Sequence, residues 1–108
     1  MNELKFPDKF LFGTAVASYQ VEGGIYNNDW TIWENKSNSV CVEPCNEACK
    51  DYEMLDQDIE LLKQLGIKAF RFSIEWSRIE PTEGNYDTDA INHSVSYTHL
   101  TLPTICSV

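Results

Sequence analysis

The sequence predicts an α/β fold organised around a strand-helix-strand unit, on three observations. An unbroken apolar run, Phe10-Leu11-Phe12, ends abruptly at Gly13. A long amphipathic segment occupies residues 46–65, and a second strand-like run occupies residues 67–74. This order is expected to join two parallel strands by a right-handed crossover, as in a (β/α)8 barrel or a doubly wound sheet. No Gly-x-Gly-x-x-Gly motif follows the first run, which weakens the dinucleotide-binding interpretation.

We expect the first strand at residues 9–14, because apolar runs without alternation are typical of strands covered on both faces. Small residues follow it: Thr14, Ala15, Ala17 and Ser18. They allow the backbone to come close to a ligand or to neighbouring loops. The amide of Gln20, just beyond, can donate and accept hydrogen bonds at once, which suits vicinal hydroxyls.

A loop follows, with one helical turn expected at residues 31–35. Its large apolar residues are Trp30 and Trp33. We expect the two indoles to pin this loop against the rest of the fold. The alternative is that they form a wall of a binding cleft.

The first long helix is expected to run from Asn46 to Leu65. Asn46 is a favourable N-cap, and the acidic Glu47 after it complements the helix dipole. Gly66 is the expected C′ glycine. Its apolar stripe has three- and four-residue spacing. The stripe consists of Ala48, Tyr52, Leu55, Ile59, Leu62 and Leu65.

The second strand alternates, so its side chains are expected on two faces. One face carries Phe70, Phe72 and Ile74, and the other carries Ala69, Arg71 and Ser73. Pro81 and Gly84 then mark a turn, and Asp87 or Thr88 is a candidate cap for a second helix starting at Asp89.

The formal net charge is −9, from 17 acidic and 8 basic residues, which argues against nucleic acid and anionic membrane surfaces as partners. No apolar run approaches the roughly 20 residues needed to span a bilayer, and the N-terminus lacks a secretory pattern, so we expect a cytoplasmic protein.

The four cysteines are Cys41, Cys45, Cys49 and Cys106. The Cys-x3-Cys-x3-Cys spacing differs from zinc patterns and Pro44 interrupts it, so we expect free thiols and no metal site.

Two motifs resemble a known family. FLFGTAVASYQVEGG, residues 10–24, resembles the N-terminal signature of glycoside hydrolase family 1, the β-glucosidase family, which runs F-x-F-G-x-A-x-A-S-Y-Q-x-E-G. AFRFSIEWSRIEP, residues 69–81, is similar to the segment around the second barrel strand of that family. The similarity extends from about Lys5 to His93 and implies the N-terminal portion of a (β/α)8 TIM barrel, with about two strands and one full helix.

The resemblance implies a retaining β-glycosidase of the β-glucosidase type, acting on β-linked glucosides or galactosides through a covalent glycosyl-enzyme and without a cofactor. The family's catalytic glutamates lie in T-x-N-E-P and T-E-N-G motifs, and neither motif occurs in these 108 residues. We therefore expect no catalytic acid/base or nucleophile here and an inactive fragment. The alternatives are a 6-phospho-β-glycosidase of the same family and a non-catalytic sugar-binding or interaction module.

Arg71 and Gln20 are the candidate site residues. A guanidinium inside a barrel needs a carboxylate partner, and the resemblance implies that Arg71 lies beside the nucleophile and orients it. The resemblance also implies that Gln20 binds hydroxyls of the non-reducing sugar, and that Glu22 has a structural role in its loop. Glu75 and Glu80 are expected to be solvated or locally paired, and His93 to be a packing or surface residue; His99 has no expected partner.

Residues 1–93 are assigned to the barrel fragment and residues 94–108 to a separate tail. The tail, SVSYTHLTLPTICSV, shows no helical stripe. We interpret it as a non-native, translated library adaptor. The alternative is a native disordered tail.

Overall fold

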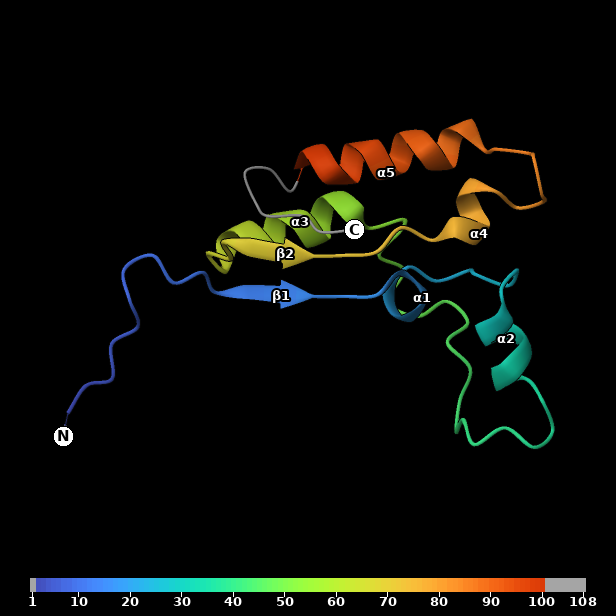
Figure 1. Cartoon of the computed structure of the whole chain (residues 1–108), viewed down its shortest axis with the longest axis horizontal. Helices are drawn as coiled ribbons and strands as arrows, with labels where there is room; N and C mark the ends of the chain where they lie inside the picture. Colours follow the sequence, from blue (N-terminus) through green and yellow to red (C-terminus); the bar gives the residue numbers. More distant parts are fainter. Residues whose placement is uncertain (1, 101–108) are drawn as a thin grey trace.

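A computed structural model describes residues 2–100 of the chain and confirms the α/β class (Figure 1). Strand β1 (Gly13–Ala15) pairs in parallel with β2 (Ala69–Arg71), with Thr14 opposite Phe70. Both strands are shorter than predicted. The helices are α1 (Ser18–Val21), α2 (Asp29–Glu34), α3 (Leu55–Gln64), α4 (Trp76–Ile79) and α5 (Thr88–Leu100).

The core forms where α3 and α5 cover one face of the strand pair (Figure 1). It consists of Leu55, Ile59, Phe70, Phe72 and Tyr97. The predicted alternation along the second strand is confirmed, since Phe70 and Phe72 are buried while Arg71 and Ser73 are exposed. Arg71 therefore lies on the face of the strand pair opposite to the two helices.

The predicted start of the first long helix at Asn46 is wrong, because α3 begins at Leu55. Asn46, Ala48 and Lys50 adopt φ values of +43°, +44° and +56°, in the left-handed region. Backbone bonds to a distant segment hold this conformation. The Gly24 N–H donates to the Asn46 carbonyl at 2.9 Å, and the Asp51 N–H donates to the Val21 carbonyl at 3.0 Å.

The predicted end of that helix is confirmed. Gly66 has φ +70°, and its N–H donates to the Lys63 carbonyl at 3.0 Å. The Ile67 N–H donates to the Leu62 carbonyl at 3.2 Å. These two bonds form a Schellman motif, which requires a residue that tolerates the left-handed conformation.

The second predicted helix is present, and its cap is Asp87, whose Oδ1 accepts from the N–H groups of Asp89 and Ala90. The expectation that no helix continues past residue 93 is wrong, because α5 extends to Leu100. The Ser94 hydroxyl donates to the carbonyl of Ala90, four residues back, and the Tyr97 ring packs 4.3 Å from that of Phe72. The adaptor interpretation of residues 94–108 stays a prediction, and Cys106 lies outside the described residues.

The first apolar run is not the buried strand that the sequence predicts. Phe6, Phe10 and Phe12 form a ring cluster with centroids 4.7–4.9 Å apart, and about half of each side chain is exposed. Strand β1 starts only at Gly13, where the pairing with β2 begins. The two strands thus have a second face that nothing in residues 2–100 covers, as expected for part of a larger sheet.

Between residues 2 and 100, no helix combines the length and the apolar character needed to cross a bilayer.

Candidate functional site

Both strands point in one direction, so their carboxyl ends meet at the same edge. The short helices α1, α2 and α4 all lie beyond the arrowheads of β1 and β2 (Figure 1). In parallel α/β folds, ligands bind at this edge, because the loops after the strands converge there. The candidate site is therefore built from residues 16–35 and 71–80.

Gln20 and Arg71 both lie at this edge with their polar groups available. Arg71 is the last residue of β2 and is paired in register with Ala15, and Gln20 follows in α1. Both are exposed, and neither side chain forms a hydrogen bond or ion pair with any other residue between 2 and 100. Arg71 has no carboxylate partner in this part of the chain, so its guanidinium remains free for an external group.

Glu22 is held in its loop by Arg78, a residue whose role the sequence did not indicate. Arg78 Nε donates to Glu22 Oε2 at 2.9 Å, and Arg78 Nη2 donates to the Gly23 carbonyl. Glu22 is 9% exposed. Burial raises the pKa of its carboxyl to about 7, although the Arg78 charge opposes that shift. Glu22 thus ties the loop after β1 to α4, which fits the structural role expected for it.

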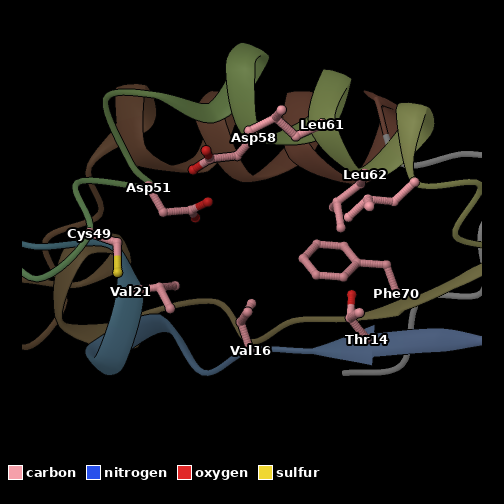
Figure 2. Close-up of a pocket in the computed structure, with 10 residues that line it drawn as sticks. Thr14, Val16, Val21, Cys49, Asp51, Asp58, Leu61, Leu62 and Phe70 are labelled. Carbon is pink, nitrogen blue, oxygen red and sulfur yellow. The ribbon is translucent and has the colours of Figure 1, made fainter.

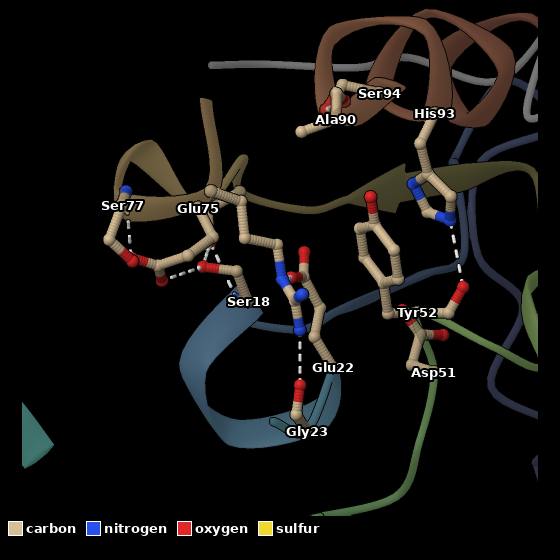
Figure 3. Close-up of polar contacts among 12 residues, drawn as sticks. Ser18, Glu22, Gly23, Asp51, Tyr52, Glu75, Ser77, Ala90, His93 and Ser94 are labelled. Atoms are coloured by element: carbon tan, nitrogen blue, oxygen red, sulfur yellow. Dashed lines mark hydrogen bonds and ion pairs between the residues drawn. The ribbon is translucent and has the colours of Figure 1, made fainter. Parts of the chain in front are cut away.

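A second set of polar contacts joins the segments that follow the two strands (Figure 3). The Ser18 N–H donates to Ser73 Oγ at 2.8 Å, and Ser18 Oγ donates to Glu75 Oε2 at 3.1 Å. Glu75 Oε1 accepts from Ser77 Oγ at 2.7 Å. The expectation of local pairing for Glu75 is confirmed, and Ser18 adds a long-range contact. These bonds fix the start of α1, the helix that carries Gln20.

His93 packs against the same region from α5. Its ring stacks on Tyr52 with centroids 3.7 Å apart, and its Nε2 donates to the Tyr52 carbonyl at 2.8 Å (Figure 3). The Arg78 guanidinium lies 4.0 Å from the centroid of the Tyr52 ring. The packing role expected for His93 is confirmed, while His99 is exposed near the end of α5.

Tyr19 connects α1 to α2. Its hydroxyl donates to Glu34 Oε1 at 2.5 Å and lies 3.1 Å from Thr31 Oγ1. Burial and the Glu34 carboxylate raise the pKa of Tyr19 to about 12, so the hydroxyl keeps its proton and donates. Glu34 also accepts from the Cys45 N–H at 3.2 Å. The loop around Cys45 is thereby joined to the same network, and Cys41, Cys45 and Cys49 are free thiols.

Trp30 and Trp33 lie on the exposed side of α2. Their rings meet edge to face with centroids 5.2 Å apart, and they are 55% and 38% exposed. They line an open hollow of about 420 Å³ together with Asp29, Ile32 and Lys36. The expectation that they pin the loop is therefore not met in residues 2–100, because the Tyr19 network fixes α2 instead.

A different hollow, of about 320 Å³, lies between α3 and the strands (Figure 2). Its walls are mainly apolar, with Phe70 and Leu62 at one end and the carboxylates of Asp51 and Asp58 at the other. Burial, followed by the neighbouring Asp58, raises the pKa of Asp51 to about 6. Gln20 and Arg71 do not line this hollow. It is a gap in the packing around α3, which Val16 and Val21 border from the loop after β1 and from α1.

The strand-end edge thus presents an amide and a guanidinium on a frame fixed by buried polar contacts. Such an edge is typical of parallel α/β folds, in which side chains at the strand ends hold the ligand. The contacts that Arg78, Ser18 and Tyr52 make in this frame could not be predicted from the sequence, because their partners are 26 to 57 residues away along the chain.

The comparisons with known proteins agree with this class. The model of the glycosyl hydrolase family 1 matches residues 2–101. The chain is 40% identical over 88 residues to beta-glucosidase A of Acetivibrio thermocellus, and 41% identical over 88 residues to myrosinase 1 of Brevicoryne brassicae. These alignments cover 75% and 74% of this chain. The chain belongs to glycosyl hydrolase family 1.

Solved structures show the same correspondence. The beta-glycosidase from Pyrococcus horikoshii matches with a TM-score of 0.84 and 39% identity, over 95% of this chain and 24% of that one. The family 1 β-glucosidase from Thermotoga maritima matches with a TM-score of 0.81 and 32% identity, over 94% of this chain and 26% of that one. The chain spans about a fifth of the length of the curated relatives above, 19% in each case. It therefore corresponds to an N-terminal portion of the barrel.

Proposed function

We propose that this chain is the N-terminal part of a retaining β-glycosidase of the β-glucosidase type. The whole enzyme hydrolyses β-linked glucosides or galactosides through a covalent glycosyl-enzyme. The observation that supports this most directly is the pair of free polar side chains, Gln20 and Arg71, at the carboxyl edge of two parallel strands of a family 1 fold. A relative in the same family, the β-glucosidase from Thermotoga maritima, has been solved in complex with galacto-hydroximolactam.

Gln20 binds the sugar in this proposal. A primary amide offers two donors and an acceptor oxygen, so it can bond two neighbouring hydroxyls of one sugar ring. The side chain has no competing partner within residues 2–100 and is exposed on α1. The Ser18 and Tyr19 contacts hold α1 in place, so Gln20 is presented from a fixed helix.

Arg71 orients the nucleophile in this proposal. A retaining glycosidase needs two carboxyl groups about 5–5.5 Å apart, one as acid/base and one as nucleophile. The nucleophile has to be ionised, and a guanidinium beside it lowers its pKa and fixes its orientation. Arg71 lies on the strand face opposite α3 and α5, where the interior of a closed barrel would be. Both carboxylates come from outside this sequence, so the 108-residue chain alone is inactive.

The decisive experiment is to sequence the source DNA across the codons for His93 and Ser94 and to express the extended open reading frame. We expect the frame to continue into T-x-N-E-P and T-E-N-G motifs. The extended protein should release the β-anomer first from a β-glucoside, as seen by ¹H NMR. An α-anomer, or a genomic stop codon after residue 108, would contradict the proposal.

The same protein tests the site residues and the phosphorylated alternative. Gln20→Ala should lower kcat/KM for p-nitrophenyl β-glucoside by about 10- to 100-fold, since lost hydrogen bonds to a bound ligand cost about 1–3 kcal/mol. Gln57→Ala on the exposed side of α3 is the matched control and should change nothing. Assays with the 6-phosphorylated glucoside, run in parallel, decide between the plain and the phosphoglycoside branches.

A further inference from the structure

Helix α1 is attached to the rest of the fold through one of its faces. Ser18 and Glu22 are four residues apart and lie on the same side of the helix, and both are buried. Glu22 is the C-cap and keeps helical backbone angles, with φ −67° and ψ −40°. Gln20 is two residues from each of them, about 200° around the helix, and is exposed. The buried anchors are therefore opposite to the amide that is the candidate sugar-binding group.

Arg78 holds the carboxyl end of α1 by two bonds at once. Its Nε donates to Glu22 Oε2 at 2.9 Å, and its Nη2 donates to the Gly23 carbonyl. Arg78 Cζ lies 4.0 Å from the centroid of the Tyr52 ring, and the Tyr52 N–H donates to the Glu22 carbonyl at 3.3 Å. Tyr52 in turn stacks on His93 (Figure 3). The end of α1 is thus held from α4, from the segment before α3 and, through Tyr52, from α5.

The charges around Glu22 make this attachment depend on Arg78. Burial raises the pKa of the Glu22 carboxyl, the charges of Glu75 and Asp51 raise it further, and Arg78 opposes them. Without the guanidinium, Glu22 would be a buried carboxyl near two acidic groups and would take up a proton. The charge-assisted bond to α4 would then be lost, together with the bond to the Gly23 carbonyl.

We propose that Arg78 is a positioning residue of the sugar site: through Glu22 it holds α1 so that Gln20 keeps a fixed place at the strand-end edge. This inference rests on the proposed function, in which Gln20 binds the sugar. The partners of Arg78 are Glu22, Gly23 and Tyr52, which are groups of the frame, so Arg78 acts on the sugar through them. An amide that is already in place loses less entropy on binding, and a shift of about 1 Å in such a group can cost about 100-fold in rate.

Hydrogen exchange, measured by mass spectrometry on the extended protein, tests this attachment without reference to activity. Arg78→Met should speed exchange in residues 17–24 by about tenfold or more and leave residues 55–64 of α3 unchanged, because the lost bonds are local. Lys36→Met removes one positive charge at an exposed position and is the matched control, which should change neither segment. Unchanged exchange in residues 17–24, or faster exchange in α3 as well, overturns the proposal.

Activity of the extended enzyme tests whether Arg78 acts through Gln20. Arg78→Met should lower kcat/KM for p-nitrophenyl β-glucoside by about tenfold in the parent enzyme. In Gln20→Ala the same change should cost less than about twofold, because the amide that it misplaces is already absent. Equal losses in the two backgrounds would show a merely structural role for Arg78 and overturn the proposal.

A conservative variant covers the case in which Arg78→Met does not fold. Arg78→Lys keeps the charge but not the planar fork, so its kcat/KM should lie between those of the parent and Arg78→Met, and its loss should also shrink in Gln20→Ala. A loss that is the same in both backgrounds again overturns the proposal. If the extended parent hydrolyses no β-glucoside while Arg78→Met or Arg78→Lys speeds exchange in residues 17–24 alone, the proposed function is wrong and the attachment of α1 by Arg78 stands.

Discussion

Two buried carboxyl groups, those of Glu22 and Asp51, make the free energy of unfolding of this chain depend on pH. Burial raises the pKa of Glu22 to about 7 and that of Asp51 to about 6. In the unfolded chain both groups titrate near 4. Between about pH 4 and these folded pKa values, the folded state therefore binds more protons than the unfolded state. The stability that these groups contribute at low pH is lost as the pH rises through the folded pKa values.

Asp51→Asn should remove the Asp51 part of this pH dependence. The free energy of unfolding of the parent chain should fall between pH 4 and pH 6, by an amount on the order of 2 kcal/mol for Asp51. The variant should show a flatter profile in urea unfolding over that interval. Asp56→Asn, at an exposed position on α3, is the control and should keep the parent slope. An unchanged slope in Asp51→Asn would show that this carboxyl ionises normally.

Tyr19→Phe tests the bond that connects α1 and α2. The substitution removes the hydroxyl that donates to Glu34 and contacts Thr31. Hydrogen bonds to charged groups contribute about 1.5–3 kcal/mol, so we expect a loss of that size in urea unfolding. Tyr86→Phe, on an exposed tyrosine, provides the comparison. Equal stabilities for the two variants would mean that water replaces the bond without cost.

At the scale of elements, two glycines with similar backbone angles have different surroundings. Gly66 has φ +70° at the end of α3, and an added Cβ would meet nothing within 4 Å. Gly23 has φ +78° after α1, and an added Cβ would collide with the Glu47 carbonyl oxygen. The first glycine is needed for its conformation alone, and the second for conformation and space.

Gly66→Ala should therefore cost about 1–2 kcal/mol, the strain of a left-handed residue with a side chain. Gly23→Ala should cost clearly more, because the backbone of the 46–50 segment has to move as well. Denaturation of both variants under one set of conditions gives the comparison. A larger loss for Gly66→Ala would contradict the close approach of Gly23 to Glu47.

The elements that the sequence predicted well are those decided by local patterns. The Schellman end at Gly66, the Asp87 cap and the alternation of Phe70 with Arg71 depend on neighbours within a few residues. The predicted start of the first long helix was wrong, because backbone hydrogen bonds with residues 21–24 compete with helix formation over residues 46–54. The ion pair of Glu22 with Arg78 could not be predicted either, since it joins side chains 56 positions apart.

At the scale of the whole molecule, the described chain is a two-stranded sheet covered on one face. Large apolar side chains remain exposed, among them Phe12 at 53%, Leu61 at 56% and Leu65 at 73%. Exposed apolar side chains promote association when they gather on a surface. The net charge of −9 opposes association at low ionic strength, and salt screens this repulsion.

We expect the 108-residue chain to self-associate in a salt-dependent way. Light scattering after gel filtration should show larger species at 0.5 M than at 0.02 M NaCl. Leu61→Lys combined with Leu65→Lys should reduce this effect, because Leu61 is exposed on α3 and Leu65 is exposed at the C-cap of that helix. Glu53→Lys, which adds positive charge at an exposed polar position, is the control. A monomer under all conditions would show that the exposed apolar side chains do not drive association.

The pairing of β1 with β2 also sets the order of events during synthesis. Gly13 pairs with Ala69, 56 positions later, and every contact between the two strands has a similar separation. At about 5–20 residues per second, β1 is made roughly 3–11 s before its partner. Throughout that interval Gly13–Ala15 has no strand to pair with, so the sheet cannot begin to form until residues 69–71 have been made.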